Sequence, residues 1–266
     1  MSAPPTRVDA PVLENAALGG PNLRLRLEVG AGWPASAPGQ FVMLSPGPLP
    51  AAPRFDPLLP RPMAVFRREG AALDVLYKVS GRGTALLAAA RPGERVRVVG
   101  PLGCGFPEAA PGAQLLLVGG GTGIASLFDV AAHAKERARV VVLLGARRAE
   151  DLMALAEFRA LGVELRLATE DGSAGRTGLV TDLLADALAD GPAAVYACGP
   201  TPMMRRAAEL AAGAGQPCVL SLENRMACGF GVCLGCAVPR REAGYALVCR
   251  DGPVFDAAAL RLEGLP

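Results

Sequence analysis

Four cysteines near the C-terminus have a spacing that suits metal binding. Cys228, Cys233, Cys236 and Cys249 form the pattern C-x4-C-x2-C-x12-C. A C-x4-C-x2-C run with a more distant fourth cysteine is the ligand spacing of plant-type [2Fe–2S] clusters. Glycines between the first three cysteines let the backbone turn tightly and point amide groups at the sulfurs. The spacing therefore predicts a [2Fe–2S] cluster and, with it, an electron-transfer protein.

The alternative is that the same four cysteines bind a structural zinc ion. Zinc sites of this kind usually combine two short spacings, such as C-x2-C with a second C-x2-C. The motifs upstream of the cysteines favour the cluster, because they predict redox cofactors.

A glycine-rich run at residues 119–123 lies between an expected strand and an expected helix. Unpaired N–H groups at the start of a helix bind phosphate, and glycines let a pyrophosphate approach the backbone closely. We therefore expect a nucleotide to bind at this run; a tight turn without a ligand is the alternative. Its members are Gly119, Gly120, Gly121, Thr122 and Gly123.

A second motif of the same region consists of Cys198, Gly199 and Pro200. These residues follow an expected strand over residues 193–197, and ligands of open α/β sheets bind at the carboxyl ends of strands. The Cys198 thiol could pack near a nicotinamide ring, or it could serve as a small buried apolar residue.

Two weaker motifs lie in the N-terminal part of the chain. Arg61 begins an expected strand and could form a fixed fork to a phosphate. Gly81, Gly83 and Thr84 precede a short expected helix, where a pyrophosphate could bind. Combined with the run at residues 119–123, these motifs predict two nucleotide cofactors, one in each of two domains.

The elements that must position these motifs fall into three blocks. The first, residues 1–108, reads as a small antiparallel β-barrel with one helix and an irregular loop over residues 46–60. The expected strands span residues 23–29, 41–44, 63–66, 73–79 and 95–99, and the helix spans residues 84–90.

The second block, residues 109–215, alternates strands with helices and predicts a doubly wound parallel sheet. The third, residues 216–266, holds the cysteines and is short for a core of its own, so the cluster should contribute stability. The fold class is therefore multidomain, β plus α/β. The expected strands of the second block span residues 115–118, 140–144, 163–167 and 193–197, and its helices 124–137, 152–161, 179–189 and 202–214.

Composition excludes several classes of function. The 266 residues carry a formal net charge of +2 without a basic run, which argues against nucleic acid as a partner. The chain has neither the apolar core of a signal peptide nor an apolar stretch long enough to span a membrane. Seven cysteines, four of them with metal-ligand spacing, argue against a disulfide framework, so we expect a cytoplasmic protein. His133 is the only histidine and lies mid-helix, so general base catalysis by it is not expected.

Together the motifs resemble the ferredoxin reductase superfamily, in which a flavin-binding barrel precedes a pyridine-nucleotide domain. The matching pieces are residues 61–62, 81–84, 100–103, 119–123 and 198–200. The C-terminal runs at residues 221–236 and 248–255 narrow the resemblance further. They are similar to the electron-transfer subunits of two-subunit, NAD-dependent dihydroorotate dehydrogenases of the class 1B type.

The resemblance implies three cofactors. NAD would bind at residues 119–123 and 198–200, and the [2Fe–2S] cluster at the four cysteines. Ala64 departs from the Ser or Thr that is common at its position, and Cys104 stands where relatives often have Asn. FAD would bind in the barrel at Arg61, Pro62, Met63, Ala64, Lys78, Gly81, Gly83 and Thr84.

The resemblance also implies a partner, a catalytic subunit with FMN that oxidises dihydroorotate in pyrimidine (UMP) biosynthesis. Electrons would pass from this FMN through the cluster and FAD to NAD⁺, in a heterotetramer with two copies of each subunit. Two alternatives remain: a flavin/iron–sulfur subunit of an NAD(P)H:ferredoxin or sulfide-type oxidoreductase, and a zinc-stabilised nucleotide-binding module without redox function.

The preferred nucleotide is open at the level of residues. Arg147 and Arg148 follow the second strand of the nucleotide block and could contact a 2′-phosphate, whereas Asp151 and Glu170 argue against one. The resemblance favours NAD.

Overall fold

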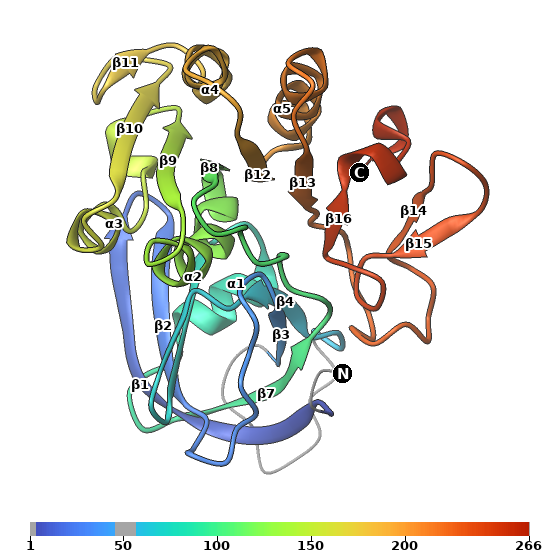
Figure 1. The fold of residues 1–266 in the computed structure, drawn as a ribbon. Coiled ribbons are helices and arrows are strands. Elements are labelled where there is room, and N and C mark those ends of the chain that lie inside the picture. The colour runs from blue at the N-terminus through green and yellow to red at the C-terminus, as the bar shows by residue number, and fades with distance from the viewer. Residues whose placement is uncertain (1–3, 46–56, 266) are drawn as a thin grey trace.

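A computed structural model describes residues 4–45 and 57–265 of the chain. Within these residues, two large sheets lie side by side and a small C-terminal segment packs beside both (Figure 1). The irregular loop expected over residues 46–60 falls mostly outside the described residues. No helix in the described part of the chain is both long enough and apolar enough to cross a membrane.

The N-terminal sheet is antiparallel and curls into a barrel around a core that includes Leu25, Val75 and Trp33. The chain between β4 and β5 joins its two edges, since the Val65 amide donates to Gln40 O (3.0 Å) and the Phe66 amide to Asp74 O (2.9 Å). The strand order is β4-β3-β7-β1-β2-β6-β5, with β1 Thr6–Gly19, β2 Asn22–Glu28, β3 Phe41–Ser45, β4 Arg61–Ala64, β5 Arg67–Glu69, β6 Ala72–Lys78 and β7 Arg95–Leu102.

The expected barrel is present, but its longest strand escaped prediction from sequence. The 14-residue β1 pairs with both β2 and β7. Its sequence contains Pro11 and Asn15, two residue types that are depleted in strands, and this obscures the alternation of apolar side chains. The short helix α1 (Arg82–Ala88) begins two residues before the expected start.

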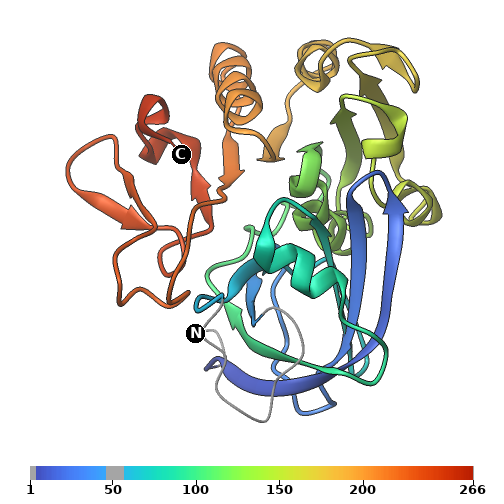
Figure 2. The same ribbon diagram turned by 180° about the vertical axis from the view of Figure 1, so that it is seen from behind.

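The second sheet is the expected parallel one apart from a single antiparallel edge strand, and helices lie on both its faces (Figure 2). Helices α2 (Ile124–Ala134) and α3 (Leu155–Ala160) cover one face, while α4 (Val180–Ala189) and α5 (Thr201–Gly213) cover the other. The strand order is β11-β10-β9-β8-β12-β13-β16, with β8 Gln114–Gly120, β9 Arg139–Ala146, β10 Glu164–Thr169, β11 Arg176–Thr177, β12 Ala194–Cys198, β13 Cys218–Ser221 and β16 Val254–Asp256.

The C-terminal segment is built into the second sheet. Its strand β16 runs antiparallel to β13, and between them lie the cysteine loop and the ribbon of β14 (Ala237–Pro239) and β15 (Tyr245–Leu247). Cys236, Val238 and Cys249 are buried in the same core as residues of β8 and β12. The segment therefore gains stability from a shared core, and a bound cluster adds to this.

The barrel and the nucleotide sheet meet through aromatic and charged contacts. Phe66 of the barrel packs on Phe128 of α2, with the ring centroids 4.5 Å apart and the rings tilted by 33°. Arg24 binds the buried Asp74 at 2.6 Å and reaches Glu157 of α3 at 3.8 Å. These contacts fix the barrel against the face of the sheet that α2 and α3 cover.

Asp129 of α2 is buried at this junction. Burial raises its pKa to about 6, and the positive charges of His133 and Arg67 offset the effect only in part. The ordinary pKa of an aspartate is about 3.9, so the fold disfavours the ionised form. The free energy of unfolding should consequently fall as the pH rises from about 4 to about 6.

We expect Asp129→Asn to remove this pH dependence. At pH 7 the variant should gain about 2 kcal/mol in the free energy of unfolding, because the buried charge is gone. At pH 4, where the native carboxyl is already neutral, the change should be small. Thermal unfolding monitored by circular dichroism across this pH range measures both, with Glu136→Gln, at an exposed carboxylate, as the control. An unaltered pH slope in Asp129→Asn would contradict the prediction.

Candidate functional site

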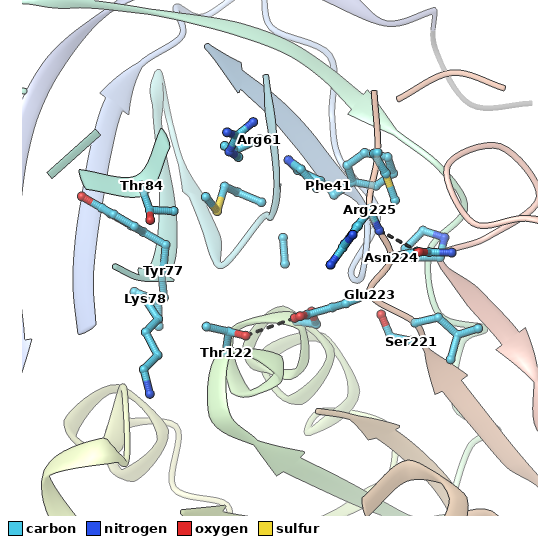
Figure 3. Close-up of a pocket in the computed structure, with 18 of the residues that line it drawn as sticks. Phe41, Arg61, Tyr77, Lys78, Thr84, Thr122, Ser221, Glu223, Asn224 and Arg225 are labelled. Atoms are coloured by element: carbon cyan, nitrogen blue, oxygen red, sulfur yellow. Dashed lines mark hydrogen bonds between the residues drawn. The ribbon is translucent and has the colours of Figure 1, made fainter. Parts of the chain in front are cut away.

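The carboxyl ends of β8, β12 and β13 meet at one edge of the second sheet, and this edge faces the barrel. They end at Gly120, Cys198 and Ser221. Two cavities open between this edge and the barrel, and the C-terminal segment borders the first of them. Lys78 and Thr122 line both cavities, so the two spaces share a wall. Figure 3 shows both residues in the first cavity.

The first cavity, about 790 Å³, lies between β4 and β6 of the barrel and the segment that follows β13. This is a size typical of cofactor pockets. Of the residues predicted to bind FAD, six line it: Arg61, Pro62, Met63, Ala64, Lys78 and Thr84. Their mixture of apolar walls, a guanidinium and an ammonium fits a flavin with its phosphates.

The two glycines predicted to bind FAD with them, Gly81 and Gly83, act on the cavity indirectly, through the side chains beside them. A Cβ on Gly83 would collide with the Arg61 guanidinium, so the glycine leaves room for that side chain. The Thr84 hydroxyl accepts hydrogen bonds from the amides of Ser80 (2.9 Å) and Gly81 (3.1 Å), which fixes the start of α1. Neither Gly81 nor Gly83 is part of the cavity wall in the described residues.

The second cavity, about 500 Å³, begins at the glycine-rich run and follows the sheet edge toward β9. Gly120, Gly121, Thr122 and Pro200 line it, as predicted for a nucleotide site. Further along, the wall contains three of the residues considered above for the choice between NAD and NADP: Arg147, Asp151 and Glu170. Arg148 pairs with Glu150 at 3.3 Å instead.

The other glycines of the two motifs allow close packing. A Cβ on Gly123 would overlap the carbonyl oxygen of Cys198, and one on Gly119 would lie 3.0 Å from Leu144. A Cβ on Gly199 would lie 2.8 Å from Gly120 O. The two predicted motifs are thus in direct backbone contact, which only glycine permits here.

Cys198 lies behind the first cavity. Its thiol is fully buried and donates to Ser126 Oγ at 3.5 Å, and Ser126 in turn lines the cavity. Burial, aided by the nearby charge of Glu223, raises the pKa of Cys198 to about 12. The thiol is therefore neutral at physiological pH.

Glu223 was not anticipated from the sequence as a site residue. It lines the first cavity, where Thr122 Oγ1 donates to its Oε1 at 3.2 Å (Figure 3). Burial raises the pKa of Glu223, and the bond from Thr122 opposes the shift. The rule that identified Cys198, the carboxyl end of a parallel strand, applies equally here, but β13 itself had not been predicted.

The four cysteines form two pairs. Cys236 Sγ and Cys249 Sγ are buried and lie 3.2 Å apart. Cys228 and Cys233 are more exposed and hydrogen-bond through their thiols. In the described residues no group of three or more His, Cys, Asp or Glu side chains is arranged around one metal ion. Four thiols in two pairs fit the ligand set of a two-iron cluster.

Backbone amides point at these sulfurs, as expected from the glycines that let the loop turn tightly. Partial burial acts to raise the pKa of Cys228, but the amides of Cys233, Phe230 and Val232 outweigh it and lower the pKa to about 6. Burial and the bond with Cys236 raise the pKa of Cys249 to about 12. The loop thus stabilises anionic sulfur at one end before any metal binds.

The cysteine loop packs directly on the barrel. A Cβ on Gly229, which has a φ of +84°, would lie 2.6 Å from Met43 of β3. Met226, two residues before Cys228, lines the first cavity. The cluster ligands and the cavity are therefore parts of one continuous structure.

Comparisons with known proteins agree with this geometry. Residues 223–261 match the model described as iron-sulfur cluster binding domain of dihydroorotate dehydrogenase B, and residues 117–209 match an oxidoreductase NAD-binding domain. The dihydroorotate dehydrogenase B (NAD(+)) electron transfer subunit of Bacillus caldolyticus is 44% identical over 233 residues, which are 85% of this chain and 87% of that protein. This chain belongs to that family of electron transfer subunits. A homologue from Aquifex aeolicus is 37% identical over 93% of this chain and 96% of its own.

Solved structures share the fold of the family. A chain from the structure of an NADH-dependent reduced ferredoxin-NADP oxidoreductase has a TM-score of 0.81 and 28% identity, covering 97% of this chain and 90% of its own. A cytochrome P450 reductase from Amycolatopsis has a TM-score of 0.67 and 26% identity, covering 80% of this chain and 68% of its own. The expected combination of barrel, nucleotide sheet and iron–sulfur segment is confirmed.

Gly123→Ala tests the contact between the two nucleotide motifs. The added methyl group overlaps the Cys198 carbonyl, and backbone on both sides cannot yield easily. We expect the loop to shift and NADH affinity to fall at least about tenfold, equivalent to ~1.4 kcal/mol, while FAD stays bound. Calorimetric titration with NADH and the flavin absorbance measure the two effects.

Gly213→Ala is the matched control for this variant, since a Cβ there meets open space at the end of α5. It should leave NADH affinity unchanged. Parental NADH affinity in Gly123→Ala would show that the contact does not shape the nucleotide site.

Proposed function

We propose that this chain transfers electrons from a separate catalytic subunit, through a [2Fe–2S] cluster and FAD, to NAD⁺. One observation carries the proposal: Met226, two residues before the first cysteine, lines the first cavity, and that cavity shares Lys78 and Thr122 with the second. The three sites stand in the order in which electrons would pass. Family membership supports this role, because the relatives are named as electron transfer subunits of dihydroorotate dehydrogenase B.

We assign the first cavity to FAD and the second to NAD. Arg61 and the start of α1 would bind the FAD phosphates, while Ala64 and Glu223 would line the flavin ring. Residues 119–123 and 198–200 would bind the nicotinamide nucleotide, and the four cysteines would hold the cluster. The corresponding division of the chain is 1–108, 109–215 and 216–266, with the third part completing the sheet of the second.

The cofactors supply the redox chemistry, since a flavin accepts single electrons from a cluster and delivers two as hydride. The residues of this chain position and insulate them. The Ala64 side chain offers no hydrogen bond to the flavin, whereas Glu223, bonded to Thr122, provides a polar group in the same cavity. A carboxyl whose pKa is raised can exchange a proton with a ligand in the cavity more readily than an ordinary glutamate.

We propose that the catalytic subunit docks over the cysteine loop. Phe230, Val232 and Leu234, which lie between Cys228 and Cys236 in the loop, and Tyr245 of β15 are 54% to 73% exposed. Leu234 also adopts a left-handed backbone (φ +60°), which is strained for leucine and holds its side chain outward. Exposed apolar groups concentrated in this way indicate a protein interface.

The partner in this proposal contains FMN and oxidises dihydroorotate to orotate for pyrimidine synthesis, in a cytoplasmic assembly of two copies of each subunit. All seven cysteines of this chain are free thiols, which suits a reducing compartment. A subunit that exchanges electrons between NAD(P)H and ferredoxin is the second candidate, favoured by the 0.81 TM-score to a chain of the ferredoxin-NADP oxidoreductase. Co-purification with an FMN protein that oxidises dihydroorotate with NAD⁺ distinguishes the two.

Cys233→Ser tests the place of the cluster in the electron path. Loss of one of four thiolates should abolish the iron–sulfur absorbance and stop electron flow from the catalytic subunit. NADH oxidation by a soluble dye should persist, because it needs only FAD. Anaerobic spectra and the two activities give the readout, and equal loss of both activities would contradict the assigned order.

Val232→Asp tests the docking surface. A carboxylate in the centre of an apolar interface should weaken binding of the catalytic subunit by at least about tenfold, with the cluster absorbance unchanged. Co-purification and analytical ultracentrifugation measure the effect. Leu13→Asp, at an exposed leucine of β1, is the control and should leave the complex intact. A Val232→Asp chain that binds its partner normally would place the interface elsewhere.

A further inference from the structure

One polar side chain in the wall of the second cavity belongs to the barrel and lacks a hydrogen-bond partner. Asn22, the first residue of β2, is 3% exposed and lines this cavity. Its amide nitrogen, Nδ2, is buried and meets no acceptor among the described residues. Buried amide donors are nearly always paired, because an unpaired donor loses its hydrogen bond to water on burial and gains none in the protein. An unpaired donor beside a cavity therefore suits an acceptor on a ligand.

The fold holds Asn22 firmly against the nucleotide half of the molecule. The turn between β1 and β2 contains Gly19 and Gly20, both with positive φ. A Cβ on Gly19 would lie 3.0 Å from Glu150 O, and one on Gly20 would lie 3.8 Å from Asp151 Oδ1. This close approach places the tip of the hairpin on the loop that carries Asp151, a wall residue of the same cavity.

Asn22 also has a defined neighbour on the barrel side. Lys78 is its partner in the register of β2 and β6 and lines both cavities. Asn22 consequently lies between the Asp151 end of the second cavity and the end shared by Lys78 and Thr122. A dinucleotide that starts at the glycine-rich run and extends toward Asp151 would pass it with its middle portion.

We propose that Asn22 donates a hydrogen bond to the ribose–pyrophosphate backbone of bound NAD(H), so that the flavin barrel completes the nucleotide site. This inference rests on the proposed function. The terminal torsion of an asparagine is soft, so the NH₂ group can turn into the cavity without backbone movement. Phosphate and ribose oxygens are the acceptors that such a ligand offers there, and Lys78 adds a positive charge beside them.

The test uses the full chain loaded with FAD and cluster, titrated with NADH. Asn22→Leu should weaken NADH binding roughly tenfold, as expected for one lost hydrogen bond to a charged group. Asn22→Asp, which keeps the shape but reverses the polarity, should weaken it further, and added salt should reduce the difference. Without NADH, Asn22→Leu should melt at the parental temperature or above, because no hydrogen bond is lost.

Gln216→Leu provides a matched control at an amide whose partners are both present: Oε1 accepts from the Ala193 amide and Nε2 donates to Ala214 O. It should lower the melting temperature and leave NADH affinity unchanged. Parental NADH affinity in both Asn22 variants would overturn this inference alone. Failure of the unaltered chain to bind NADH would overturn the proposed function and the inference together.

Discussion

The backbone contact between Gly123 and the end of β12 is the constraint on which the site depends. Without a side chain at Gly123, the glycine-rich run can lie against the Cys198 carbonyl, and Gly199 can lie against Gly120. This contact brings Thr122 within reach of Glu223 and Ser126 within reach of the Cys198 thiol. The wall shared by both cavities is therefore a product of backbone packing, and the polar side chains on it follow from that packing.

Much of this arrangement could be predicted from the sequence, because its signals are local. The apolar runs of β8 and β9 and the glycines after β8 indicate a parallel sheet with a nucleotide site wherever they occur. The cysteine spacing is likewise readable from short range. What was missed depends on long-range pairing: β1 is recognised only by its partners β2 and β7, and Glu223 only by the place of β13 beside β12.

Charge placement separates the three regions of the site. The apolar, exposed side chains gather around the cysteine loop, the cavities contain both basic and acidic groups, and the junction between barrel and sheet buries Asp74 among arginines. Each pattern answers a different physical demand. An interface excludes water, a nucleotide site binds phosphate, and a rigid junction keeps two cofactor sites in register.

The course of the last strand has a consequence for how the molecule is made. β16 pairs with β13 only after the intervening cysteine loop has been laid down, so the nucleotide sheet is incomplete until residues 254–256 have left the ribosome. The iron–sulfur loop is thus enclosed between two neighbouring strands of a sheet that closes last. A nascent chain therefore cannot complete the sheet of its nucleotide half before the residues of its metal-binding half have been synthesised.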